Sequence, residues 1–254
     1  MRDVDSLPGD DLIAGIHPLK EALSSADVRL DQVTIREGHR NRQQDEIFRL
    51  AKRVRVPVKL IPSEALDRLA RPLNHQGVLG YVSRKVYVSL DALLEEAEKK
   101  KTSPFLLVLD GIEDPRNMGA IIRTAEGAGV NGVVVPDRRS TGMTSVVART
   151  SAGALEHVAV TRVTNMSQSI DQLKSNNVWV YGLDQNASKS YLELDYRGPV
   201  SLVVGGEGKG IRSGVLKRCD DRVAIPMEGT VLSLNVSVAV AVLLYEVVRQ
   251  RRNK

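Results

Sequence analysis

The chain has 254 residues, 42% of them hydrophobic, which is enough for one large domain or two modest ones with an ample core. Its formal net charge of +5 and sequence pI of about 9.3 favour a polyanionic partner such as nucleic acid, although charge that serves only solubility explains them too. The single cysteine, Cys219, excludes a disulfide framework and a CxxC redox pair, and no HExxH-like spacing predicts a metal site.

Neither end of the chain predicts a membrane or an export signal. Residues 1–10 are acidic and lack an apolar signal core. The uncharged run Gly229–Tyr245 falls short of the roughly 20 residues of a membrane span and includes polar residues. We therefore expect a soluble, cytoplasmic protein.

Short strands and helices alternate over the first third of the chain, which predicts a small α/β domain over residues 1–83 that starts with a short disordered tail. A short apolar run occurs at Leu12–Ile16. The strands are expected at Gln32–Arg36, Val58–Ile61 and Gly77–Val82, and the helices at Leu19–Ser24, Arg42–Val54 and Ser63–Leu69, with Ser63 as a cap.

The charges of this first domain lean basic. Arg40, Arg42 and Arg53 could follow an RNA backbone, and His75 could contact RNA from a turn. A basic stripe on an exposed helix is also explained by solvation alone. We expect these four residues to bind RNA.

Residues 84–103 differ in character and are expected to be a linker. They contain the charged segment Asp91–Lys101, in which acids come first and bases last, as the helix macrodipole favours. A second domain is expected over residues 104–254.

This second region again alternates strands and helices. Strands are expected at Phe105–Leu109, Gly132–Pro136, Val158–Thr161, Val178–Gly182, Val200–Val204 and Arg222–Pro226, and helices at Ala120–Ala128, Ser145–Ala154 and Ser167–Ser175. This order predicts an α/β domain with a mostly parallel sheet. Ligands of such sheets bind beyond the carboxyl ends of the strands, where the loops at Asp110, Gly205 and Met227 lie.

The last strand leads into a Gly-containing loop and a long apolar helix. No charged side chain occurs between Glu228 and Glu246, so we expect this segment to be almost wholly buried. Polar residues near the helix start could bind an anionic ligand, or could simply cap a core helix.

The loop Gly205–Gly210 fits neither common phosphate-binding motif. Lys209 is followed by Gly210 where a P-loop has Ser or Thr, and the glycine spacing differs from a Rossmann fingerprint. Glu207 would repel phosphate, so a cationic or hydroxyl-rich ligand fits better.

Three ordered stretches carry a family resemblance: Asp110–Ala125, Val203–Ile211 and Ile225–Ala239. They resemble the motifs of the SpoU family, the S-adenosylmethionine-dependent RNA ribose 2′-O-methyltransferases of the SPOUT superfamily. Gly15–Leu23 and His75–Val78 also resemble the small substrate-binding domain that precedes the catalytic domain in many members. The resemblance covers nearly the whole chain. It is closest to the branch that methylates a guanosine ribose in 23S rRNA, with the tRNA branch as the alternative.

The resemblance implies a trefoil-knotted, mostly parallel sheet in the C-terminal domain, in place of the doubly wound sheet that strand order alone favours. It also implies a homodimer through the knotted domain, with the helix that begins near Asn235 in the interface. The resemblance further implies that the protein binds RNA, most of all rRNA, and that it binds neither a metal nor a membrane.

The resemblance also implies the functional residues. S-adenosylmethionine would be cradled by the backbone around Gly205, Gly206, Ile225, Met227 and Leu234, and the catalytic set would be Asn117, Arg123, Glu207, Ser233 and Asn235. From the residues alone, Asn117 could be a helix cap and Arg123 a solvated helix residue. A non-catalytic RNA-binding protein of the same fold is the main rival function, and a nucleotide-binding hydrolase is a remote one.

Overall fold

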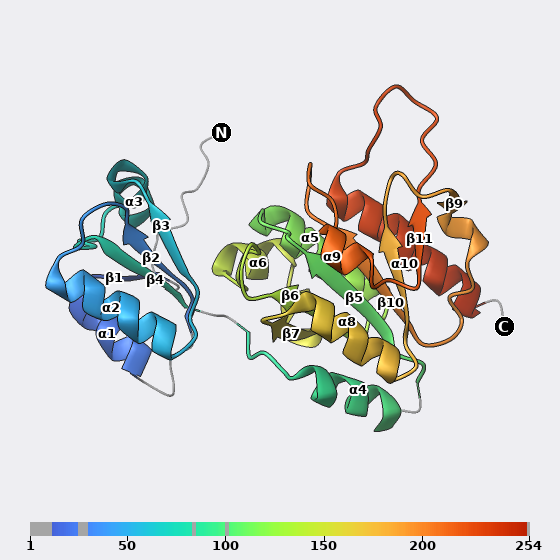
Figure 1. Ribbon diagram of the computed structural model, residues 1–254, viewed down its shortest axis with the longest axis horizontal. Coiled ribbons are helices and arrows are strands. Elements are labelled where there is room, and N and C mark those ends of the chain that lie inside the picture. Colours follow the sequence, from blue (N-terminus) through green and yellow to red (C-terminus); the bar gives the residue numbers. More distant parts are fainter. Residues whose placement is uncertain (1–11, 25–29, 83–84, 100–101, 253–254) are drawn as a thin grey trace. The chain divides into compact units, whose positions relative to one another are not determined.

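The computed structural model describes residues 12–24, 30–82, 85–99 and 102–252. It divides the chain into two compact units: Met1–Arg84 with Gly142–Ser145, and Lys85–Thr141 with Val146–Lys254 (Figure 1). The disordered tail that the sequence predicts lies outside the described residues.

The first unit is a four-stranded mixed sheet with three helices. The sheet order is β1-β4-β2-β3, in which β2 and β3 are parallel and the other pairs are antiparallel. Alternating apolar residues bury Val33 and Ile35 of β2 against Leu19 and Ile47 of the helices. The elements are β1 Leu12–Ala14, α1 Ile16–Ser24, β2 Leu30–Arg36, α2 Arg42–Arg53, β3 Val58–Ile61, α3 Ser63–Ala70 and β4 Val78–Val82. The predicted small α/β unit is confirmed.

The helix starts of the first unit differ in how they are capped. Before α2, Asn41 Oδ1 accepts from the Gln44 N–H at 2.9 Å while Gln44 Oε1 accepts from the Asn41 N–H at 3.2 Å. At α3 the predicted Ser63 cap is wrong. The helix begins at Ser63 itself because the Pro62 carbonyl already accepts the first backbone bonds, and no side chain caps it.

The second unit is built on a seven-stranded sheet in which every observed pairing is parallel, in the order β7-β6-β5-β10-β8-β11-β9. The predicted parallel sheet is thereby confirmed. Its strands are β5 Phe105–Asp110, β6 Gly132–Pro136, β7 Ala159–Val163, β8 Trp179–Leu183, β9 Lys189–Ser190, β10 Val200–Gly205 and β11 Asp221–Ala224. The helical elements are α4 Leu90–Lys99, α5 Pro115–Gly127, α6 Ser145–Thr150, α7 Ala154–His157, α8 Met166–Ser175, η1 Tyr191–Glu193, α9 Ser213–Leu216 and α10 Val236–Arg252.

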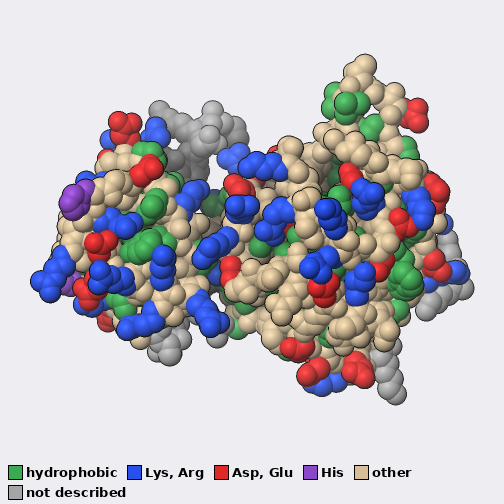
Figure 2. Space-filling model, viewed as in Figure 1, with side chains coloured by type: hydrophobic (Ala, Val, Ile, Leu, Met, Phe, Trp, Pro, Cys, Tyr) green, Lys and Arg blue, Asp and Glu red, His purple; other side chains and the backbone are tan. Residues whose placement is uncertain are grey.

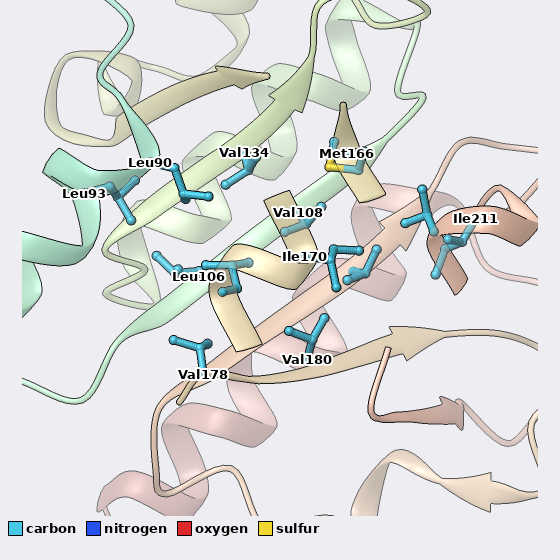
Figure 3. Close-up of a cluster of buried hydrophobic side chains, with 13 residues drawn as sticks. Leu90, Leu93, Leu106, Val108, Val134, Met166, Ile170, Val178, Val180 and Ile211 are labelled. Carbon is cyan, nitrogen blue, oxygen red and sulfur yellow. The ribbon is translucent and has the colours of Figure 1, made fainter. Parts of the chain in front are cut away.

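A buried apolar cluster joins this sheet to α4 and α8 (Figure 3). Leu90 and Leu93 of α4 pack with Leu106 and Val108 of β5 and with Ile170 of α8. The segment expected to be a linker therefore contributes to the core of the second unit, because its two leucines are three residues apart and face the sheet together.

Two helical segments of this unit differ in their bounds from the sequence prediction. Asp114 Oδ1 accepts from the Arg116 N–H at 2.6 Å and Pro115 takes the first helical position, so α5 starts five residues before the expected Ala120. The helix expected over Ser145–Ala154 is divided into α6 and α7, and Gly153 adopts φ +89° between them.

The expected burial of the last apolar segment is wrong for the single chain. Val231 and Leu232 are 68% and 76% exposed because residues 225–235 form a loop outside the sheet. Helix α10 packs one face against α5 and β10, which leaves Val238 and Tyr245 exposed. Among the described residues, no helix is long and apolar enough to cross a membrane.

Candidate active site

The loops that follow β5 and β10 meet at the carboxyl edge of the second sheet. A Cβ atom on Gly206 would lie 2.2 Å from the Gly111 carbonyl oxygen, and one on Gly205 would lie 2.0 Å from the Gly210 carbonyl carbon. The Gly206 N–H also donates to the Asp110 carbonyl at 3.1 Å. These two glycines are required because the backbone packs against itself here.

A buried ion pair fixes the same two loops. The Asp110 side chain is 0% exposed at the end of β5, whereas that of Arg212 is 45% exposed. Arg212 donates to it from Nε at 2.8 Å and from its backbone N–H at 2.9 Å. This clamp holds both ends of the 206–212 loop, since Gly206 bonds to the backbone of Asp110 as well. Asp110 and Arg212 were not predicted as a pair. The sequence signal for such a pair is an aspartate at the end of a fully apolar strand, because its buried carboxylate needs a partner.

Three predicted catalytic side chains meet beside this clamp. Glu207 Oε1 accepts from Asn117 Nδ2 at 3.1 Å and from Asn235 Nδ2 at 2.8 Å. Asn235 Nδ2 also donates to Asn117 Oδ1 at 3.1 Å. Asn235 Oδ1 accepts from the Ser237 N–H at 2.9 Å, which fixes the orientation of the amide and caps α10. Residues 118 positions apart in the sequence are thus joined in one polar cluster.

The other two predicted catalytic residues lie outside the cluster. Arg123 is exposed on α5, six residues and well over one turn beyond Asn117, and it has no hydrogen bond or ion pair with a described residue. Ser233 is exposed in the loop before α10 and likewise bonds to nothing in the described part of the chain. Neither side chain is held by the protein, so each is available to a ligand.

The residues predicted to bind the cofactor border this loop. Ile225 is half-buried, and Met227 and Leu234 are exposed. Within the described chain, the backbone groups of residues 225–234 make no hydrogen bond. This segment therefore offers free N–H and C=O groups to a polar ligand at the carboxyl edge.

The predicted RNA-binding residues lie in the first unit. Arg42 and Arg53 are exposed on α2, and the Arg40 guanidinium lies 4.4 Å from the Phe48 ring centroid while its Nε donates to Asp45 at 2.8 Å. Figure 2 shows many Lys and Arg side chains over this unit. His75 is occupied within the unit: it lies 2.8 Å from Asp67 through Nε2, and its Nδ1 accepts from the Gly77 N–H at 3.0 Å.

Other features of the described chain are poorer candidates for a functional site. Burial raises the pKa of the Cys219 thiol to about 11, so it is protonated at neutral pH and a poor nucleophile. No group of three or more His, Cys, Asp or Glu among the described residues is placed to hold a metal ion. A hollow of about 690 Å³ lies between α4 and the end of α8, far from the cluster, and its acidic lining of Asp91, Glu95 and Glu98 would repel RNA.

Comparisons with known proteins place both regions of the chain in known families. Residues 104–245 match the SpoU rRNA Methylase family, and residues 12–88 match the family of RNA 2′-O ribose methyltransferase substrate-binding domains. The "Putative TrmH family tRNA/rRNA methyltransferase YacO" of Bacillus subtilis (strain 168) is 39% identical over 95% of this chain and 96% of its own length.

Solved structures show the same fold. An RNA 2′-O ribose methyltransferase is similar with a TM-score of 0.55 and 29% identity, over 95% of this chain and 88% of that chain. The SpoU methyltransferase AviRb from Streptomyces viridochromogenes, solved with AdoMet, has a TM-score of 0.61 at 23% identity, covers 96% of this chain and 91% of its own, and supports the fold alone.

The two family matches define an RNA 2′-O-ribose methyltransferase with an N-terminal substrate-binding domain. The chain belongs to the SpoU rRNA methylase family.

Proposed function

We propose that this protein transfers a methyl group from S-adenosylmethionine to the 2′-hydroxyl of a guanosine ribose in 23S rRNA. The observation that carries the proposal is the hydrogen-bonded cluster of Asn117, Glu207 and Asn235, which brings residues from all three family motifs to one edge of the sheet. A tRNA guanosine is the alternative substrate, because the names of the relatives leave tRNA and rRNA open. Either substrate agrees with the cytoplasmic location that the sequence predicts.

The residues fit the methyl donor. Residues 225–234 leave their backbone donors and acceptors free, as binding of an adenosine and an amino acid requires. Glu207 places a carboxylate nearby, which suits a cationic sulfonium better than a phosphate. Gly205, Gly206, Ile225, Met227 and Leu234 would hold the molecule. When bound, it supplies a methyl group that its positive charge already activates.

The protein then has to position the ribose and stabilise charge. Because an arginine side chain carries a fixed positive charge in proteins, we assign Arg123 to electrostatic stabilisation of the developing 2′-alkoxide. Asn117 and Asn235 fix the Glu207 carboxylate, which in turn can orient a ribose hydroxyl. Ser233 is a further donor from the free loop.

Transfer of labelled methyl groups to rRNA and tRNA from cells that lack the protein tests this function. The modified position is mapped by its resistance to alkaline cleavage. One protected rRNA guanosine supports the proposal as stated. A protected tRNA site instead means that tRNA, and not rRNA, is the methylated RNA. Absence of transfer to free RNA and to ribosomal precursor particles would favour the non-catalytic rival.

The basic side chains of α2 are proposed to bind the RNA backbone. We expect Arg42→Gln/Arg53→Gln to weaken RNA binding and to lower the slope of log affinity against log salt by about 0.7–0.9 per lost phosphate contact. Filter binding over a salt series measures this, and an unchanged slope means that these arginines are only solvated. Arg40 and His75 stay predicted contacts, although both have partners within the unit.

We also propose a homodimer through α10, since Val238 and Tyr245 on this helix are exposed and apolar. Sedimentation should give a dimer for the wild type and a monomer for Val238→Glu/Tyr245→Lys, because two charges would be buried in the interface. Val54→Lys, at an exposed apolar position in the first unit, is the control and should leave the dimer intact. A wild-type monomer contradicts the proposal.

A further inference from the structure

We propose that the turn after β6, which carries Arg138 and Arg139, binds the RNA backbone next to the ribose that is methylated. This inference rests on the proposed function. It assigns to the second unit an RNA contact separate from the basic face of α2.

The turn is fixed against the loop that follows β5. The Thr141 N–H donates to the Ile112 carbonyl at 2.9 Å, and Ser140 Oγ donates to the same oxygen at 3.2 Å. A Cβ atom on Gly111 would lie 3.6 Å from the Arg139 carbonyl oxygen, so these two backbones are also in contact.

The same glycine connects the turn to the polar cluster. Gly206, which precedes Glu207, packs its Cα against the Gly111 carbonyl. Strands β6, β5 and β10 are neighbours in the sheet, and their loops form one continuous rim at its carboxyl edge. Only the loop after β5 therefore lies between the two arginines and the loop that carries Glu207 of the cluster.

Backbone and side chains of the turn both point to a ligand. Arg139 has φ +60°, a left-handed conformation that is unfavourable for a residue with a side chain and that recurs at functional sites. Arg138 and Arg139 are exposed, and neither makes an ion pair or hydrogen bond with a described residue. Arg197 and Arg218 elsewhere on this unit are instead paired with carboxylates.

A phosphate is the group that such a turn fits. Guanidinium groups bind phosphate through two parallel hydrogen bonds, and two adjacent ones can hold one phosphate or two consecutive phosphates. The 2′-hydroxyl of a nucleotide is next to its own 3′-phosphate. Hydrogen bonds to that phosphate therefore fix the position of the ribose. Such contacts place the strand and do not read its sequence.

The test compares two variants that each remove two positive charges. Arg138→Gln/Arg139→Gly alters the turn, with glycine chosen because it adopts φ +60° without strain. Lys99→Gln/Arg197→Gln alters exposed side chains away from this edge. Each is assayed for methyl transfer, for S-adenosylmethionine affinity, and for the salt dependence of binding to a labelled RNA fragment that spans the mapped site.

We expect the turn variant to raise the KM for RNA roughly tenfold and to lower the salt slope by about 1.4–1.8, while its S-adenosylmethionine affinity matches the wild type. The control variant should keep the wild-type values. Equal behaviour of the two variants overturns the inference, as does loss of S-adenosylmethionine affinity in the turn variant. A wild-type protein that methylates no RNA instead overturns the proposed function, which separates the two failures.

Discussion

Arg212→Ala is expected to lower the free energy of unfolding by about 3 kcal/mol and to reduce methyl transfer about a hundredfold. The substitution leaves the Asp110 carboxylate buried without its cationic partner, and removal of one member of a buried pair costs about 3–5 kcal/mol. We take the lower end because the Arg212 side chain is 45% exposed.

The loss of activity has a geometric cause. Arg212 and Asp110 hold both ends of the loop that carries Glu207, so their separation lets Glu207 move from Asn117 and Asn235. A displacement of about 1 Å at a catalytic group can cost about a hundredfold in rate. Urea unfolding and initial rates of methyl transfer measure the two effects.

Two further variants distinguish the effect of losing the Asp110–Arg212 ion pair from the effect of losing any arginine charge. Arg218→Ala removes an arginine paired with Asp171 in an exposed ion pair, so it should cost less than about 1 kcal/mol and keep full activity. Asp110→Asn/Arg212→Ala removes both charges and should recover part of the stability but not the activity. Wild-type activity in Arg212→Ala would show that the clamp does not position Glu207.

Local patterns predicted most strands and helices of both units because these are amphipathic or wholly apolar, but they did not predict the short elements β9 and α9. The continuous apolar run Phe105–Leu109 predicted a strand buried on both faces, and β5 is such a strand. The first turn of α5 was missed because Asp114 and Pro115 were read as a loop, although together they are a strong helix start.

The last apolar segment shows where such reasoning fails. A charge-free run from Gly229 to Tyr245 predicted burial, yet Val231 and Leu232 are exposed in the chain alone. An apolar composition predicts only that a segment is shielded from water. It does not predict whether the same chain, a ligand or a second copy of the protein shields it.

Local patterns alone do not predict the site residues, and the family motifs were needed as well. Asn117, Glu207 and Asn235 come from three segments, and no periodicity predicts their meeting. The Asp110–Arg212 pair depends on the 206–212 loop turning back over β5, which only the tertiary structure reveals. The knot and the dimer stay predictions.

Arg123→Ala is expected to lower the rate of methyl transfer by a factor of about 10²–10³ and to leave S-adenosylmethionine affinity nearly unchanged. The side chain is exposed and bonds to no described residue, so its removal should not disturb the fold. Loss of one donor to a developing oxyanion has an effect of this size. Single-turnover methyl transfer and equilibrium dialysis of labelled S-adenosylmethionine give the two quantities.

Arg123→Lys decides how the arginine acts. If it stabilises the alkoxide, a lysine keeps the positive charge and should recover part of the rate, with the shortfall reflecting the loss of the planar guanidinium. If it must instead accept the proton, lysine is the easier group to deprotonate, and the rate should rise with pH towards the lysine pKa. Wild-type turnover in Arg123→Ala would remove Arg123 from the reaction. A pH-independent partial recovery in Arg123→Lys, beside an inactive Arg123→Ala, is the result that electrostatic stabilisation predicts.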